Sequence, residues 1–193
     1  MNMEDTIILL GDSSFIKDVE EQLFYVLDKY KSIGINRIVN KYSTTYQVFL
    51  DERMISTANA HPDIPVRSLK RYGDLIRVKN KELFNSYSFD FKIHTEKDIP
   101  MNNKLPWCGF THDFALSYVI TKGWKNVVLI GAADMNIGSS HYSVNMAFTP
   151  NYKLIQQSKR FIEEVCSKRI NVYTCNPNSL LTVERVSIED LLT

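Results

Sequence analysis

Three short, continuously apolar segments constrain the fold of this chain more than any other feature of its sequence. Each is followed within a residue or two by glycine or by small polar residues. They are Thr6–Leu10, Asn126–Ile130 and residues 170–174. Runs of this kind, bounded by turn residues, are typical of strands in a parallel sheet, because helices cover both faces of such a sheet and leave little of it in water.

Helical patterns alternate with these strands. After the first strand, apolar residues recur at helical spacing on one face, namely Val19, Leu23, Val26, Leu27 and Tyr30. Ser13 or Ser14 is placed to cap this helix, because a serine hydroxyl can accept a hydrogen bond from a free N–H group of the first turn. Further helices are predicted over residues 110–121, 152–167 and 187–192, and the last of them is expected to be short and capped.

Two more strands are predicted over residues 33–38 and 46–50, whereas residues 51–107 hold only short apolar pieces between prolines and polar or basic residues. Irregular structure with short strands or helices is expected in that stretch. Alternating strands and helices favour an α/β fold, with a doubly wound, mostly parallel sheet and helices on both faces. We therefore expect a single α/β domain over residues 1–193, with an irregular insertion at about 52–107.

Composition and charge argue against several classes of protein. The 193 residues suffice for one domain with a substantial core. With 23 Lys and Arg against 22 Asp and Glu, the net charge of +1 gives no strong attraction to nucleic acid or membrane, although a nucleic acid partner stays open. No apolar stretch approaches the ~20 residues of a membrane span.

The cysteines and the first residues bear on the compartment. Cys108, Cys166 and Cys175 show no paired spacing typical of a metal site, and their odd number fits buried or idle thiols in a reducing environment. The chain starts with polar and acidic residues, unlike the basic start of a secretory signal. These features favour a cytoplasmic protein.

Small and polar residues gather where the predicted strands end. Ligands of open α/β sheets bind outside the carboxyl ends of the strands. Four such ends carry turn residues, namely Gly11-Asp12-Ser13-Ser14, Gly34-Ile35-Asn36-Arg37, Gly131-Ala132-Ala133-Asp134 and Asn176-Pro177-Asn178-Ser179. The first leads into a helix N-terminus, which attracts phosphate. One such turn is more often only a turn, but several at one edge favour a ligand site.

Two histidines are candidates for acid–base chemistry. His141 lies in Gly138-Ser139-Ser140-His141-Tyr142, within a loop that is long for a simple connection. It can act as a base or hold a phosphate, and a solvated surface histidine is an equal alternative. His112, beside Asp113 at a helix start, is either an active imidazole–carboxylate pair or part of a helix cap.

Metal and serine chemistry have weaker support. The chain has no Asp-x-Asp motif, although Asp12, Asp51 and Asp134 would hold Mg²⁺ if they converged at strand ends. We expect no metal. A serine hydrolase is disfavoured, because Gly-x-Ser-x-Gly is absent and no histidine follows His141.

The chain resembles the bacterial lipooligosaccharide sialyltransferases, which use CMP-sialic acid, and the related motility-accessory-type proteins. The likeness covers both ends of the chain but not residues 53–107. Its most specific part is Lys122-Gly123-Trp124-Lys125-Asn126-Val127-Val128-Leu129-Ile130-Gly131, then Asp134, Gly138-Ser139-Ser140 and Tyr142, and finally Val172-Tyr173-Thr174-Cys175-Asn176-Pro177-Asn178-Ser179-Leu180-Leu181. Upstream, Gly11-Asp12-Ser13-Ser14 and Ile35-Asn36-Arg37 take the places of two of the family's nucleotide-side turns.

This resemblance implies a Rossmann-like, sialyltransferase-like fold and a nucleotide pocket without metal. The implied pocket residues are Asp12, Ser13, Asn36, Asp51, Thr111 and Tyr142. In the family, tyrosine hydroxyls stabilise the leaving phosphate and a loop histidine deprotonates the acceptor. The chain departs from the pattern where Thr111-His112 replaces a Ser-Gly pair, and where the family's histidine falls near Tyr152.

We therefore expect a metal-independent, inverting glycosyltransferase with a CMP- or UDP-type nucleotide sugar and an acceptor glycan or other hydroxyl-bearing acceptor. The expected catalytic residues are His141, Tyr142 and, as the second choice of base, His112. The expected nucleotide-site residues are Gly11, Asp12, Ser13, Asn36, Asp51, Thr111, Asp134, Ser139 and Ser140. The alternatives are a nucleotide- or pterin-diphosphate-handling transferase and a non-catalytic nucleotide-binding module. A homo-oligomer is compatible with all three.

Overall fold

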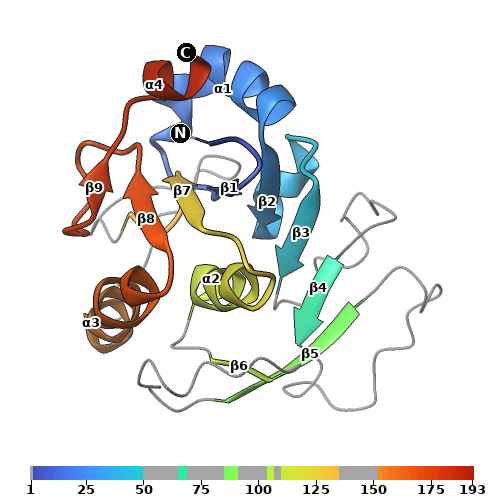
Figure 1. Ribbon diagram of the computed structural model, residues 1–193, viewed down its shortest axis with the longest axis vertical. Helices are drawn as coiled ribbons and strands as arrows, with labels where there is room; N and C mark the ends of the chain where they lie inside the picture. Colours follow the sequence, from blue (N-terminus) through green and yellow to red (C-terminus); the bar gives the residue numbers. More distant parts are fainter. Residues whose placement is uncertain (1, 50–64, 69–84, 91–103, 107–109, 135–151) are drawn as a thin grey trace.

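A computed structural model describes residues 2–49, 65–68, 85–90, 104–106, 110–134 and 152–193. Within these ranges nine strands form one sheet in the order β6-β5-β4-β3-β2-β1-β7-β8-β9 (Figure 1). Every neighbouring pair of these strands runs parallel. The predicted doubly wound α/β sheet is confirmed.

The bounds of the elements follow the chain. The strands are β1 (Thr6–Leu10), β2 (Lys31–Ile35), β3 (Tyr46–Phe49), β4 (Pro65–Ser68), β5 (Asn85–Asp90), β6 (Lys104–Pro106), β7 (Asn126–Ile130), β8 (Asn171–Thr174) and β9 (Glu184–Arg185). The helices are α1 (Ile16–Lys29), α2 (Thr111–Thr121), α3 (Tyr152–Arg160) and α4 (Ile188–Leu192). A 3₁₀ segment (Asn36–Asn40) follows β2, and a π-helical turn (Phe161–Val165) with a 3₁₀ turn (Cys166–Lys168) continues α3.

The two faces of β1 belong to two separate apolar cores. Ile7 and Leu9 pack into the core that α2 and α3 cover, whereas Ile8 and Leu10 pack into the core under α1 and α4. Alternate side chains of a strand point to opposite faces, so a strand covered by helices on both sides has to be apolar throughout. Figure 1 shows α1 and α4 on one side of the sheet and α2 and α3 on the other.

The order of the strands reverses at β1. From β1 the chain moves outward through β2 to β6, and after α2 it returns to β7, which pairs with the other side of β1. The boundary between β1 and β7 is therefore the topological switch point of the sheet. Ligands of open α/β sheets bind at the carboxyl ends of strands at this position.

Several local expectations are confirmed and others are corrected. Predicted strands coincide with β1, β3, β7 and β8, and Ser187 caps α4 by accepting a hydrogen bond from the N–H of Asp190. The strand predicted over 33–38 ends at Ile35, because Asn36 turns into the 3₁₀ segment with a φ of 54°. The expected short strands in residues 51–107 are β4, β5 and β6, which extend the sheet on one side.

The predicted serine cap of α1 is wrong. Phe15 holds the N-cap position of α1, and no side chain caps it. The Ser13 hydroxyl instead lies at the end of β7, where it donates a hydrogen bond to Asp134. A contact between distant strands therefore takes priority over local capping.

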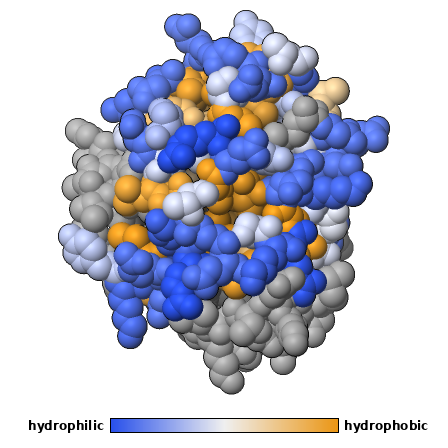
Figure 2. Space-filling model, turned by 60° about the vertical axis from the view of Figure 1, so that its left-hand side comes forward, coloured by the Kyte–Doolittle hydropathy of each residue, from blue (hydrophilic) through white to orange (hydrophobic). Residues whose placement is uncertain are grey.

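The surface and the cysteines add two observations. Hydrophilic side chains cover much of the face in Figure 2, with hydrophobic ones between them. None of the described helices combines the length and the apolar character that crossing a membrane requires. Cys166 and Cys175 are buried free thiols, as expected, and Cys108 lies outside the described residues.

Candidate functional site at the carboxyl edge of the sheet

The register of the sheet places three of the predicted turns next to one another, at the carboxyl ends of β1, β2 and β7. Leu10 of β1 lies opposite Gly34 of β2 on one side and Ile130 of β7 on the other. Neighbouring strands are about 4.8 Å apart. The residues that follow these three positions therefore begin side by side at the carboxyl edge.

The turns after β1 and β7 are in direct backbone contact. The N–H of Gly11 donates to the carbonyl of Ile130 at 2.9 Å. A Cβ on Gly11 would overlap the carbonyl oxygen of Gly131, and a Cβ on Gly131 would lie 2.7 Å from a methyl carbon of Ile16. Gly131 also has a φ of 61°, which glycine adopts without strain. Two glycines are thus required for the turns to meet.

Ser13 and Asp134 join the same two turns through their side chains. The N–H of Ser13 donates to the carbonyl of Gly131 at 3.0 Å, and its hydroxyl donates to Oδ2 of Asp134. Asp134 is 5% exposed, and its main-chain carbonyl accepts from the N–H of Leu180 at 3.1 Å. Burial raises the pKa of Asp134, and the Ser13 hydroxyl and the nearby Asn176 side chain partly offset that rise. Sequence reasoning placed both residues at strand ends but did not pair them.

Asn36 and Thr111 join the end of β2 to the start of α2. The hydroxyl of Thr111 donates to Oδ1 of Asn36 at 3.2 Å. Thr111 is the first residue of α2, where the helix dipole favours negative charge. Asn36 and Thr111 are both half-buried. The structure thus brings together two predicted site residues that are far apart in the sequence.

Backbone strain is concentrated at this edge. Among the described residues other than glycine, those with positive φ are Asn36 (54°) and Ala133 (56°). Asn36 follows β2 and Ala133 follows β7, the two strands that pair with β1. A left-handed conformation costs a residue such as Ala133 about 1–2 kcal/mol, whereas asparagine adopts it more readily, and such strain clusters at functional sites. The strain marks this edge independently of its polar residues.

The start of α1 offers fewer free N–H groups than the sequence suggested. The N–H groups of Ile16, Lys17 and Asp18 donate to the carbonyls of Ser13, Ser14 and Phe15, respectively, at 3.0–3.2 Å. A phosphate at this helix would have to compete with those bonds and lie near the Asp134 carboxyl group. These three N–H groups of the first turn are therefore engaged, and a phosphate role of this turn stays a prediction.

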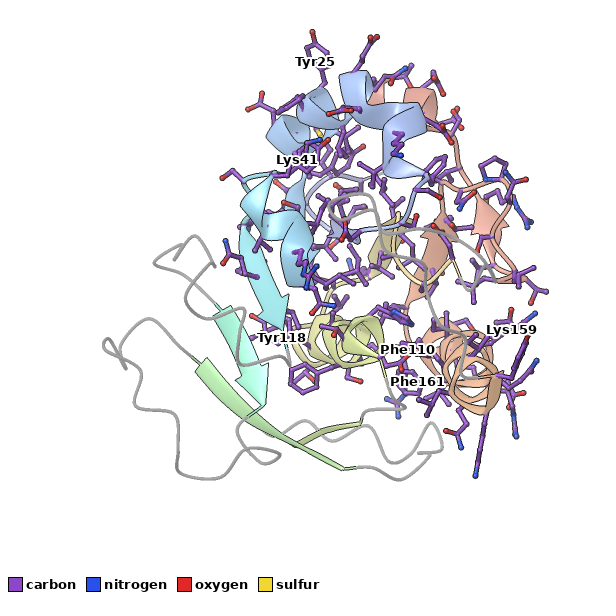
Figure 3. The ribbon with its side chains drawn as sticks, turned by 180° about the vertical axis from the view of Figure 1, so that it is seen from behind. Tyr25, Lys41, Phe110, Tyr118, Lys159 and Phe161 are labelled. Atoms are coloured by element: carbon purple, nitrogen blue, oxygen red, sulfur yellow. The ribbon has the colours of Figure 1, made fainter. Side chains whose placement is uncertain are left out.

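A second buried polar cluster lies where α2 faces α3. Asp113 accepts from the N–H of Phe110 at 3.0 Å through Oδ2 and from the hydroxyl of Ser158 through Oδ1. The Ser158 hydroxyl also lies 2.9 Å from Nε2 of His112, whose ring stacks on Phe110 with 5.1 Å between centroids. Phe110 packs against the apolar core that includes Phe161, which follows α3, and both residues are labelled in Figure 3. Asp113 thus has the capping role that was one of the two expectations.

The electrostatics of this cluster favour a structural role for His112. Burial lowers the pKa of His112 to about 3 and raises the pKa of Asp113 to about 7. In a catalytic triad the imidazole lies between the carboxylate and the nucleophile, whereas here the Ser158 hydroxyl lies between His112 and Asp113. Ser158 has no sequence signal that predicts this pairing across 45 residues.

The remaining predicted site residues lie outside the described part of the chain. These are Asp51, Ser139, Ser140, His141 and Tyr142. Within the described ranges no group of three His, Cys, Asp or Glu residues is arranged to hold a metal ion. Asp12 and Asp134 follow adjacent strands, and Asp51 is the third member of the suggested Mg²⁺ set. That alternative stays open.

Comparisons with known proteins show the fold. No family model matches the chain, and no curated protein matches it. The solved structure of the MAf glycosyltransferase from Magnetospirillum magneticum AMB-1 aligns with a TM-score of 0.65 at 11% identity. The alignment covers 98% of this chain and 34% of that one, so this chain spans about a third of that protein's length. The likeness to a motility-accessory-type protein is one of architecture.

Proposed function

We propose that this chain is a glycosyltransferase that binds a CMP- or UDP-type nucleotide sugar at the carboxyl edge of β1, β2 and β7. The observation that carries the proposal is the Ser13–Asp134 hydrogen bond, which joins two turns at the topological switch point. Ligands bind at this position in open α/β sheets. A solved glycosyltransferase with the same architecture supports the class of reaction.

The proposed reaction is a single in-line displacement without a metal ion. The acceptor oxygen attacks the anomeric carbon while the bond from that carbon to the donor phosphate breaks, which inverts the carbon. The leaving phosphate gains negative charge, which hydrogen-bond donors stabilise. Ser139, Ser140 and Tyr142 are the proposed donors, and His141 is the proposed base for the acceptor proton. These four roles rest on the sequence.

The binding partners are proposed from the sequence as well. The acceptor is a glycan or another hydroxyl-bearing molecule, nucleic acid included. A single nucleotide-binding domain over residues 1–193 and a homo-oligomeric state stay predictions.

Nucleotide binding is tested by thermal shift. CMP, UDP, GDP and their sugars are added in excess to the wild-type protein, and at least one is expected to raise the melting temperature, since a ligand that binds the native state stabilises it. Thr111→Val removes the hydroxyl that binds Asn36 and is expected to reduce the shift. Thr121→Val is the matched control, because its hydroxyl bonds to Ser117 at the far end of the same helix.

Each outcome separates one class of function from another. A melting temperature that no nucleotide changes contradicts the donor assignment. A shift that requires Mg²⁺ favours the diphosphate-handling transferase. A shift without turnover of any donor favours a non-catalytic nucleotide-binding module. Equal loss of the shift in both threonine variants would place the nucleotide away from the end of β2.

A further inference from the structure

Asp134 is a buried carboxyl group whose hydrogen-bonding capacity is only partly used. It is 5% exposed, and Ser13 donates to its Oδ2. Its Oδ1 is buried and has no hydrogen-bond partner among the described residues, because the Asn176 side chain, although near enough to lower the pKa of this carboxyl group, does not meet Oδ1 with hydrogen-bond geometry. An unsatisfied buried acceptor destabilises the folded protein. The free oxygen at a ligand-binding edge therefore indicates a group that arrives with the ligand.

The position of this carboxyl group is set before any ligand binds. The Ser13 hydroxyl holds one oxygen, and the N–H of Leu180 holds the main-chain carbonyl of the same residue. The preceding residue, Ala133, has a φ of 56°, which the contacts on both sides of it maintain. A preorganised acceptor of this kind is suited to recognition, because little ordering remains to be done on binding.

The charge of the Asp134 carboxyl group limits which ligand group can bind to its Oδ1. A phosphate oxygen would be repelled by an ionised carboxylate in a buried site. A divalent cation takes several oxygen ligands, and Mg²⁺ held by Asp12, Asp51 and Asp134 is kept as an outcome of the test below. A neutral hydrogen-bond donor avoids that repulsion and needs no further ligands. Nucleotides carry such donors as ribose hydroxyls and as exocyclic amines of the bases.

We propose that Oδ1 of Asp134 accepts a hydrogen bond from a neutral donor of the nucleotide, a ribose hydroxyl or a base amine, and that Ser13 holds the carboxyl group in place for it. The inference rests on the proposed nucleotide site and goes further, because it assigns the β1–β7 turns to the nucleoside rather than to the phosphate. The pair of turns then selects which nucleoside binds.

The test measures dissociation constants by calorimetry for CMP, UMP, 2′-deoxy-CMP and 3′-deoxy-CMP. The wild-type protein is expected to bind the ligand that lacks the recognised donor about 10- to 100-fold more weakly than CMP, as for a hydrogen bond to a charged group. Weak binding of a deoxynucleotide identifies a ribose hydroxyl as the donor. Weak binding of UMP identifies the amine of cytosine.

Two variants connect that discrimination to Asp134. Asp134→Ala removes the acceptor, so it is expected to weaken CMP binding by the same factor of about 10 to 100. This variant is also expected to bind CMP and the analogue that lacks the recognised donor with equal affinity. Asp134→Asn keeps the shape of the side chain, so it carries the test if the alanine variant does not fold. Its amide oxygen is expected to replace Oδ2 beside the Ser13 hydroxyl, which leaves an NH₂ group facing the ligand donor and likewise abolishes discrimination. Asp28→Asn, an exposed position on α1, is the matched control and keeps the wild-type pattern.

The outcomes distinguish this inference from the proposed function. If the wild-type protein binds none of the nucleotides, the nucleotide site is wrong and the inference fails with it. If CMP binds but the wild type does not distinguish the analogues, or if the Asp134 variants discriminate as the wild type does, only the role of Asp134 is wrong. Binding that requires Mg²⁺ would replace the neutral donor with a cation.

Discussion

Burial shifts the pKa values of two neighbouring residues, His112 and Asp113, in opposite directions. The pKa of His112 falls from 6.5 to about 3, and the pKa of Asp113 rises from 3.8 to about 7. Both shifts favour the neutral form, because both side chains are buried around the Ser158 hydroxyl. At neutral pH His112 is therefore uncharged, whereas Asp113 titrates close to neutral pH.

These shifts predict opposing effects of pH on stability. The raised pKa of Asp113 contributes stability that is present below pH 4 and is lost as the pH rises to about 7. The lowered pKa of His112 contributes stability that is present above pH 6.5 and is lost as the pH falls to about 3. The two contributions therefore offset each other between about pH 4 and 6.5 in the wild-type protein.

Single substitutions are expected to expose each contribution. In His112→Gln the free energy of unfolding should fall, relative to wild type, as the pH rises through this window. In Asp113→Asn it should rise with pH over the same range. Each pKa unit corresponds to about 1.4 kcal/mol. Urea unfolding at several pH values measures both slopes, and parallel curves for all three proteins would show that neither group is shifted.

At the scale of elements, Ser158 connects α3 to the start of α2. Its hydroxyl bonds to Asp113 and contacts Nε2 of His112, and the side chain is fully buried. The same end of α2 carries Thr111, which holds Asn36 at the end of β2. The cluster thus supports the geometry of the proposed site from the side opposite to α1 and α4.

Removal of the Ser158 hydroxyl is expected to destabilise the protein. Ser158→Ala leaves two buried polar groups without this partner, so the free energy of unfolding should fall by about 1–3 kcal/mol. Ser167→Ala is the matched control in the helical segment that continues α3, where the exposed hydroxyl bonds only to the carbonyl of Glu163. It should change stability by less than about 0.5 kcal/mol. Denaturant unfolding compares the two, and equal losses would contradict the role of the cluster.

At the scale of the whole molecule, the strand order places two deeply buried strands beside the proposed site. β1 and β7 lie within the sheet and are buried on both faces, with a single half-buried residue at the start of β7. β9 is a short strand at one edge of the sheet, and both of its residues are exposed. The turns that form the candidate site therefore extend from strands that are buried on both faces, and we expect these strands to be the least mobile part of the sheet.

Hydrogen exchange is expected to follow this order. Amides of Ile8, Leu9 and Val128 should exchange only through global unfolding, because opening either strand disrupts both cores. Amides of β9 should exchange through local opening at a lower free energy. Native-state exchange measured by NMR checks this, and equal protection of β1 and β9 would contradict a sheet centred on β1.

Part of the candidate site was predictable from the sequence. Gly11, Ser13, Asn36, Thr111 and Asp134 all have small or polar side chains next to expected strand or helix ends, and the structure places them at one edge. Their binding roles stay predictions. The pairing of Ser13 with Asp134 was not predictable, because 121 residues separate them and the pairing depends on β7 lying beside β1.

Local patterns of residues were sufficient to predict β1, β7, α1 and the cap of α4. The patterns are a continuous apolar run, helical spacing of apolar residues and a serine before an acidic turn, and each of them involves only residues that are close together in the sequence. Strand order, the loss of the serine cap on α1 and the link between α2 and α3 required the folded chain. Each of these depends on groups that are distant in sequence and meet only when the sheet closes around β1, where a buried polar group is stabilised by the partner that the fold supplies.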